Sequence, residues 1–200
     1  QFSQHLPYPC IFMNDANAAG FAELWKNPEA ENLIYLSLSN TVGGAIFHDG
    51  NLLPGDAFRC GEAGHMTLIP DGKPCYCGKT GCVDAYCSAR LLSDLSGGRL
   101  EDFFLGLQQN NPNYRSVWDT YLKHLAVVIN NLHMILDYDI VLGGYVGSFL
   151  TPWLDTIRHL VAERNTFEDD GSFVKLCTYQ TGAAAYGAAM DVMEEFLRTV

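Results

Sequence analysis

The sequence predicts an α/β fold, and three features indicate it. A strand at 139–142 ends in Gly143 and Gly144 and is followed by a helix at about 152–163, a unit in which ligands bind at the carboxyl ends of strands. A long helix at 116–136, with apolar residues at helical spacing, precedes this strand. With 200 residues, 48% of them hydrophobic, the chain can bury a core as one domain or as one large lobe of a bigger protein.

The amino-terminal segment is expected to place polar residues at the end of a strand. Residues 9–13 are predicted to form a short buried strand. The polar run at 14–17 then forms a turn that caps a helix running towards Trp25.

A β-rich region is predicted next. Residues 32–39 form an alternating apolar strand, and the strand at 42–48 pairs with it or with 51–53. The dipeptide Asp49-Gly50 between the last two segments is a strong hairpin signal.

Residues 61–87 are rich in glycine and polar groups and are predicted to be a loop. Such a loop is too long for a compact domain unless something pins it, and a metal ion would do so. Beyond it we expect a helix start at 88–95, a last strand at 173–177 and a closing helix that begins in the small-residue run at 181–190.

The charge of the chain disfavours several classes of partner. A net charge of -11 and a pI of about 4.8 repel phosphate backbones and anionic lipid, so contact with DNA would need another domain. No apolar run approaches the roughly 20 residues of a membrane helix, and the first residues do not resemble a secretion signal, so we expect a cytoplasmic protein. Because the chain begins with Gln1, we also expect a fragment or a processed chain.

The cysteines predict a metal site rather than disulfides. Their number, seven, is odd, and three of them fall within eight positions, which suits reduced thiols. Zinc takes four nitrogen or sulfur ligands, and that number is supplied by His65, Cys75, Cys77 and Cys82. With all four positions filled by protein, the zinc would be structural. A redox pair or a chance grouping of free thiols is the alternative, and Cys87 is expected to be a spectator.

Four motifs together resemble the ROK family of bacterial sugar kinases and sugar-responsive repressors. They are Asn14-Asp15-x-Asn17, Gly61-Glu62-x-Gly64-His65, Cys75-x-Cys77-Gly78-x-x-Gly81-Cys82-x-Asp84 and Val141-Leu142-Gly143-Gly144. The resemblance implies an actin-like, ribonuclease-H-like α/β fold of two lobes. Residues 1–200 would form the single carboxyl-terminal lobe, with the zinc loop at 61–87 embedded in it.

The resemblance also implies a sugar site built from Asn14, Asp15, Glu62, His65 and Asp84. In the kinases, the aspartate at position 15 would be the general base that takes the proton of the attacking sugar hydroxyl. Taken alone, Asp15 fits a helix cap equally well, and Glu62 fits an exposed loop carboxylate. Zinc on one nitrogen of His65 would leave the other as a directed donor to a sugar oxygen. Asp84 stands where the family usually has glutamate, so its reach is shorter.

The nucleotide motifs are weaker. The family's kinases have a Gly-Thr-Gly type loop where this chain reads Ser-Asn-Thr-Val before Gly43 and Gly44. Gly143 and Gly144 keep the position expected beside adenosine, although close packing also requires glycine there. The family's first phosphate motif, Asp-x-Gly-Gly-Thr, does not occur in the chain, so the chain as given is not expected to phosphorylate a sugar efficiently.

Three functions follow as hypotheses. The leading one is the zinc-stabilised, sugar-binding effector lobe of a ROK-type transcriptional regulator, whose helix-turn-helix lies in a domain upstream of this chain. The alternative is an ATP-dependent kinase of a hexose or N-acetylhexosamine, with Asp15 as base and Mg²⁺ accompanying ATP. The third is a lobe that serves only for dimerisation, and family habit suggests a homodimer or a larger assembly.

Overall fold

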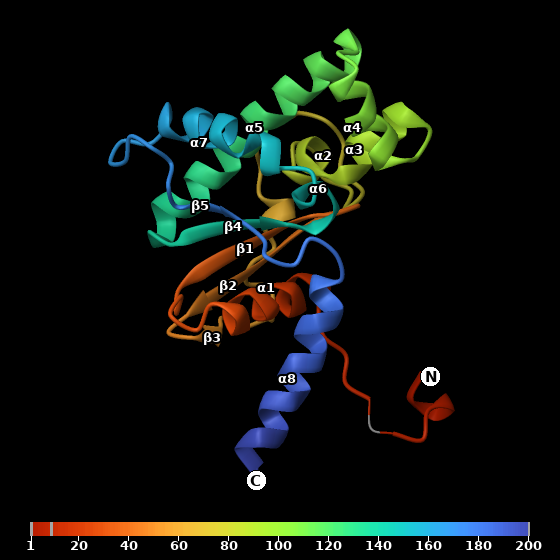
Figure 1. Cartoon of the computed structure of the whole chain (residues 1–200), viewed down its shortest axis with the longest axis vertical. Coiled ribbons are helices and arrows are strands. Elements are labelled where there is room, and N and C mark those ends of the chain that lie inside the picture. Colours follow the sequence, from red (N-terminus) through yellow and green to blue (C-terminus); the bar gives the residue numbers. More distant parts are fainter. Residues whose placement is uncertain (1, 9, 200) are drawn as a thin grey trace.

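The computed structural model describes residues 2–8 and 10–199, and its centre is a mixed five-stranded sheet in the order β3-β2-β1-β4-β5 (Figure 1). β1, β2 and β3 pair antiparallel, whereas β4 pairs parallel with both β1 and β5. This topology confirms the predicted α/β fold. The strands are β1 (Leu33–Leu38), β2 (Val42–His48), β3 (Asn51–Leu52), β4 (Asp139–Gly143) and β5 (Val174–Leu176).

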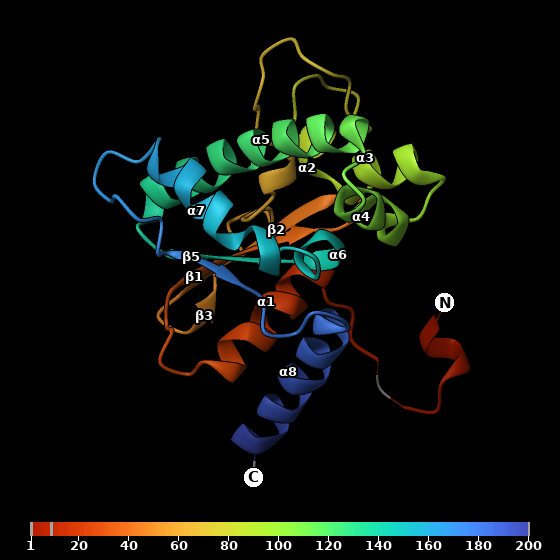
Figure 2. The same cartoon turned by 45° about the horizontal axis from the view of Figure 1, so that its top comes forward.

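Helices cover both faces of the sheet: α5 and α7 lie on one face and α1 on the other, with α8 packed across α1 (Figures 1 and 2). No helix among the described residues is both long and apolar enough to cross a membrane. The helices are α1 (Asp15–Lys26), α2 (Asp84–Cys87), α3 (Ala89–Ser93), α4 (Leu100–Gln108), α5 (Pro112–Leu136), α6 (Gly144–Gly147), α7 (Leu154–Ala162) and α8 (Ala183–Thr199), with 3₁₀ turns η1 (Phe2–His5), η2 (Ala63–His65), η3 (Asp94–Ser96) and η4 (Thr151–Trp153).

Strand β1 is buried on both faces and divides the core into two parts. Ile34 and Leu36 point into the larger cluster, which contains α5 and its fully buried Trp118. Leu33 and Tyr35 point the other way, into the cluster beneath α1. Helices on both faces explain why this strand is nearly continuous in apolar residues.

The predicted hairpin is confirmed. Strands β2 and β3 pair through His48 and Asn51, and the two residues between them have positive φ angles, 48° at Asp49 and 72° at Gly50. Two positive φ angles are the requirement of a type I′ turn, which matches the twist of the flanking strands.

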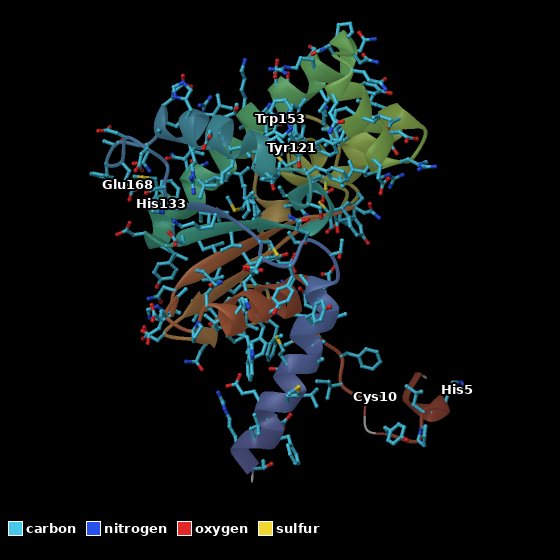
Figure 3. All side chains as sticks on the ribbon, viewed as in Figure 1. His5, Cys10, Tyr121, His133, Trp153 and Glu168 are labelled. Carbon is cyan, nitrogen blue, oxygen red and sulfur yellow. The ribbon has the colours of Figure 1, made fainter. Side chains whose placement is uncertain are left out.

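The strand predicted at 9–13 is wrong for the residues that are described. Pro9 lies outside the described residues. Residues 10–13 have no regular structure, and Cys10 lies on the amino-terminal segment that projects from the domain (Figures 1 and 3). Ile11 and Phe12 are 56% and 83% exposed. An apolar run forms a strand only where another strand satisfies its backbone groups, and none of the five strands lies beside this segment.

The long helix begins earlier than predicted, and one helix was missed. The side chain of Asn111 accepts hydrogen bonds from the amides of Asn113 and Tyr114, and Pro112 occupies the first turn, so α5 starts at 112 rather than 116. The segment that became α4 was not predicted as a helix, although Phe103 and the other apolar residues of one face are buried there.

A buried carboxylate joins α1 to the segment after β5. Glu23 is 2% exposed, and its Oε1 accepts from the amides of Thr178 and Tyr179 at 2.7 and 3.2 Å and from the Cys177 thiol at 3.0 Å. Burial, followed by the neighbouring carboxylate, raises the pKa of Cys177 to about 12, so this thiol remains a donor. Three donors compensate Glu23 for its loss of water.

Glu23→Gln is therefore expected to lower the free energy of unfolding by about 1–3 kcal/mol, because the charge-assisted hydrogen bonds to Oε1 become neutral ones. Urea unfolding of the intact protein measures this. The exposed Glu29 provides the matched control: Glu29→Gln should change stability by no more than about 0.5 kcal/mol. Equal midpoints for the two variants would contradict the bridging role of Glu23.

Candidate metal centre and ligand cavity

The turn that carries Glu62 and His65 lies directly against the backbone of β2. A Cβ atom on Gly64 would lie 2.1 Å from the carbonyl oxygen of Val42, and one on Gly61 would lie 2.6 Å from a second carbonyl of the same strand. Only glycine permits this approach, and Gly61 also has a φ of +84°. The two glycines thus fasten the turn to the sheet and leave Glu62 and His65 exposed.

A small hairpin at 73–81 brings the cysteines together. Its tip is closed by a hydrogen bond of 3.0 Å from the amide of Gly78 to the carbonyl of Cys75. Gly78 and Gly81 have φ angles of +84° and +78°, and a Cβ on Gly81 would lie 1.9 Å from the carbonyl oxygen of Ile69. Both predicted turn glycines are therefore required by the backbone.

The four predicted metal ligands form one group. Their donor atoms all lie within 4.8 Å of one another, and the Sγ atoms of Cys77 and Cys82 are 3.7 Å apart. One imidazole and three thiols are the number and kind of ligand that zinc prefers. Burial raises the pKa of Cys82 to about 12, whereas a hydrogen bond from the backbone of Lys79 lowers the pKa of Cys77. Cys87 is fully buried and lies outside the group.

Tyr76, the residue between the first two cysteines, lies against the ring of His65. Its hydroxyl oxygen lies 3.2 Å from Nε2 of His65, and the two rings meet edge to face with centroids 5.4 Å apart. A hydroxyl thus already occupies the hydrogen-bonding direction of one ring nitrogen. Sequence reasoning missed Tyr76, although its place inside the Cys-x-Cys motif puts it beside the metal group by necessity.

A cavity of about 810 Å³ opens at the carboxyl ends of β1 and β4. Its lining includes Ser37 and the loop 39–41 after β1, and Gly144 after β4. In open α/β sheets this is the place where ligands bind. Asp15, at the amino terminus of α1, lines the same cavity.

Asp15 is not the cap of its helix. The Oδ1 atom of Asn14 accepts from the amides of Ala16 and Asn17 at 2.9 and 3.1 Å, which is the capping pattern. Asp15 is the first helical residue; one of its oxygens accepts from the amide of Ala16 at 2.9 Å, and the residue is exposed. Its carboxylate therefore has an oxygen available to a ligand.

The other residues of the predicted sugar site do not line this cavity, and one has a structural partner. Glu62 and His65 lie on the turn beside β2. Asp84 is buried, and its Oδ1 accepts from the amide of Val42 at 2.6 Å. This bond and the contact of Gly64 attach the metal loop to the first residue of β2, immediately after the loop that lines the cavity.

Of the four glycines predicted to bind nucleotide, one lines the cavity and three do not. Gly144, with a φ of +77°, lines the cavity, and a Cβ there would also lie 2.6 Å from the amide nitrogen of Leu38. Gly44 and Gly143 have packing reasons of their own, because a Cβ on either would lie 2.6 Å or less from another segment. A Cβ on Gly43 would lie 3.1 Å from that of Ala16 in α1. Sequence reasoning missed one wall of the cavity, which comes from 179–185; the small-residue run there was the available signal, because small side chains leave room for a ligand.

A sequence model of the ROK family matches residues 1–195. The chain belongs to the ROK family. The mixed sheet and the histidine–cysteine group agree with this membership.

Two relatives of the chain are sugar kinases. The chain is 30% identical to a glucokinase from Halalkalibacterium halodurans over 94% of its length, and 29% identical to an N-acetylmannosamine kinase from Salmonella typhi over 91% of its length. It spans 64% of the length of each of these relatives. A solved ROK transcriptional regulator, a homologue of the E. coli MLC protein, matches with a TM-score of 0.74 at 22% identity, over 94% of this chain and 54% of that one. This last likeness concerns the fold alone.

Proposed function

We propose that this chain is the carboxyl-terminal lobe of an ATP-dependent ROK sugar kinase, with a hexose or an N-acetylhexosamine as the substrate. The two kinase relatives favour this alternative over the effector lobe of a regulator, which was the leading hypothesis from the sequence. The regulator's fold is shared by both classes and does not separate them.

The observation that carries the proposal is the position of Asp15. Asp15, Gly144 and the loop 39–41 line the same cavity. This loop corresponds to a phosphate loop in the family's kinases. A kinase needs its base and its phosphate-binding backbone in one cavity, because phosphoryl transfer depends mainly on positioning. A protein that only senses a sugar has no such requirement.

In the proposed reaction, a sugar hydroxyl bound beside Asp15 loses its proton to the carboxylate. The hydroxyl oxygen forms a bond to the γ-phosphorus of ATP, the bond from that phosphorus to the β,γ-bridging oxygen breaks, and ADP leaves. Mg²⁺ bound with ATP supplies charge neutralisation on the phosphates. Asp15 thus orients the hydroxyl and accepts its proton.

We further propose that the four-ligand group holds a structural zinc ion. With four protein ligands the metal has no open position for an activated water, so its effect on the sugar is indirect. It would fix the ring of His65, which the resemblance assigns to a sugar site with Asn14, Asp15, Glu62 and Asp84; of these five residues only Asp15 lines the cavity. Because Oδ1 of Asp84 already accepts from Val42, only its second oxygen remains for a sugar.

One observation favours the regulator as a second candidate. The amide of Val42, which follows the loop 39–41, donates to Asp84 and is therefore not free to approach a phosphate. The side chains of Ser39, Asn40 and Thr41 stand where the kinases have a glycine-rich loop. Both features would weaken nucleotide binding while leaving a sugar site in place.

The deciding experiment measures sugar-dependent ADP release by the full-length protein across glucose, mannose, galactose, N-acetylglucosamine and N-acetylmannosamine. A kinase turns over ATP with one or two of these sugars and releases an equal amount of sugar phosphate. Calorimetric binding of a sugar with no ADP release would reverse the order of the two candidates. If no sugar binds at millimolar concentration, the kinase and the regulator are both rejected. The remaining hypothesis is then a lobe that serves only for dimerisation.

A further inference from the structure

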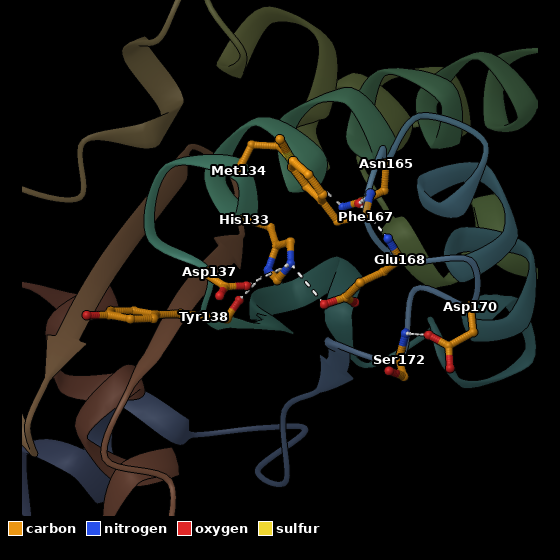
Figure 4. A network of polar contacts seen from close by, with 9 residues as sticks. All are labelled: His133, Met134, Asp137, Tyr138, Asn165, Phe167, Glu168, Asp170 and Ser172. Carbon is orange, nitrogen blue, oxygen red and sulfur yellow. Dashed lines mark hydrogen bonds and ion pairs between the residues drawn. The ribbon is translucent and has the colours of Figure 1, made fainter.

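A second group of potential metal ligands lies far from the cysteine loop, where α5 ends. Figure 3 shows His133 and Glu168 side by side, away from Tyr121 and Trp153. His133 is on the last turn of α5, and Glu168 is on the loop between α7 and β5. Figure 4 shows that Asp137, just after α5, approaches the same histidine. The site proposed here is separate from the proposed kinase cavity and from the zinc loop.

His133 is held rigidly. Its side chain is 7% exposed, and the ring stacks on Phe173 with centroids 3.5 Å apart and an interplanar angle of 6°. Its Nδ1 lies 2.9 Å from the carbonyl oxygen of Tyr138. A carbonyl oxygen only accepts, so Nδ1 carries the proton of this hydrogen bond, and in the neutral ring Nε2 presents a lone pair.

Nε2 of His133 faces two carboxylates. It lies 3.6 Å from Oδ1 of Asp137 and 3.5 Å from Oε1 of Glu168. These separations exceed the N–H···O range of about 2.7–3.2 Å. A tetrahedral site with metal bonds of about 2.0–2.2 Å has ligand-to-ligand edges of about 3.3–3.6 Å. Both measured separations match such an edge. A lone pair and two carboxylates at such distances repel one another unless a metal ion or a proton lies between them.

The two carboxylates differ in exposure: the side chain of Asp137 is 92% exposed and that of Glu168 is 35% exposed. Asp137 terminates α5 in the left-handed conformation, with a φ of 57°. The side chain of Asn165 accepts from the amides of Phe167 and Glu168 at 2.8 and 2.9 Å and so fixes the turn that presents Glu168 (Figure 4). Within the described part of the chain, neither carboxylate forms an ion pair with lysine or arginine.

We propose that His133, Asp137 and Glu168 bind a divalent first-row transition ion such as Zn²⁺ through one nitrogen and two oxygens, with water completing the coordination. One imidazole and two carboxylates suit Zn²⁺ and its neighbours in the row. Because the ligands come from the end of α5 and from the loop before β5, the ion fastens this loop to the helix. The site has no thiolate, so it is chemically distinct from the cysteine group.

The test is a Co²⁺ titration of the full-length protein after its cysteine site has been loaded with one zinc per chain. We expect one further equivalent to bind, with weak visible absorption and without the near-ultraviolet band that cobalt–thiolate bonds produce. Amide hydrogen exchange at 165–172 should slow when it binds, because the ion closes the loop onto α5.

Asp137→Asn and Glu168→Gln should each weaken this binding at least tenfold. Asparagine tolerates the left-handed conformation, so the first change leaves the helix end intact. The control is Glu163→Gln, because Glu163 stands 3.5 Å from the exposed His159 but has no second carboxylate. This variant should bind Co²⁺ as the unaltered protein does.

Two results would overturn the proposal. The first is no additional equivalent at millimolar Co²⁺, which would mean that the three side chains interact only with one another. The second is an additional equivalent whose affinity does not change in Asp137→Asn or in Glu168→Gln, which would place the ion elsewhere.

Discussion

Cys77→Ser is expected to lower the free energy of unfolding by about 4 kcal/mol or more, because structural zinc binding in small modules contributes on the order of 10 kcal/mol to folding. Cys77 is one of four donors within 4.8 Å of one another, and serine is a poor zinc ligand. The loop that Cys77 helps to close contacts β2 through Gly64 and Asp84. Loss of the metal should therefore also destabilise the sheet. Urea unfolding with metal analysis of the intact protein measures both effects.

Cys60→Ser makes the same chemical change at a partly buried cysteine outside the metal group, and should cost no more than about 1 kcal/mol. Removal of zinc from the unaltered protein with a chelator should lower its stability towards that of Cys77→Ser. The chelator should have little further effect on the variant itself. A zinc-free protein that unfolds at the same urea concentration as the metal-loaded one would refute a structural metal.

Features that depend on neighbouring residues in the chain could be predicted from the sequence. The β2–β3 hairpin follows from Asp49 and Gly50, because few other dipeptides accept two positive φ angles. The metal group follows from the spacing of three cysteines, because few arrangements of thiols this close in the chain keep them apart.

Features that depend on distant partners could not be predicted. Ile11 and Phe12 read as a buried strand, yet burial requires a neighbour that the apolar pattern does not specify. Glu23 reads as an exposed helical glutamate, and only the fold brings it to the amides of Thr178 and Tyr179. Asp84 was assigned to the sugar by family likeness, and its bond to the amide of Val42 became visible only in three dimensions.

Asp15→Asn is expected to lower kcat for sugar phosphorylation by the full-length protein about 100- to 10 000-fold, the usual contribution of a general base. The amide can still hydrogen-bond a sugar hydroxyl but cannot accept its proton at neutral pH, so KM for the sugar should change far less than kcat. Because Asn14 rather than Asp15 caps α1, the helix should be unaffected. Steady-state ADP release and calorimetric sugar binding provide the two readouts.

The matched control for this loss is Asp155→Asn. Asp155 is an exposed aspartate in the first turn of α7 and does not line the cavity, so the same change there tests the loss of a carboxylate at a helix amino terminus. Asp155→Asn should retain full turnover. If Asp15→Asn raised KM and left kcat unchanged, the carboxylate would only bind the sugar, and the base would have to be sought among the other groups that line the cavity. A drop of at least about 100-fold in kcat with sugar affinity retained is the result that a proton acceptor at the start of α1 requires.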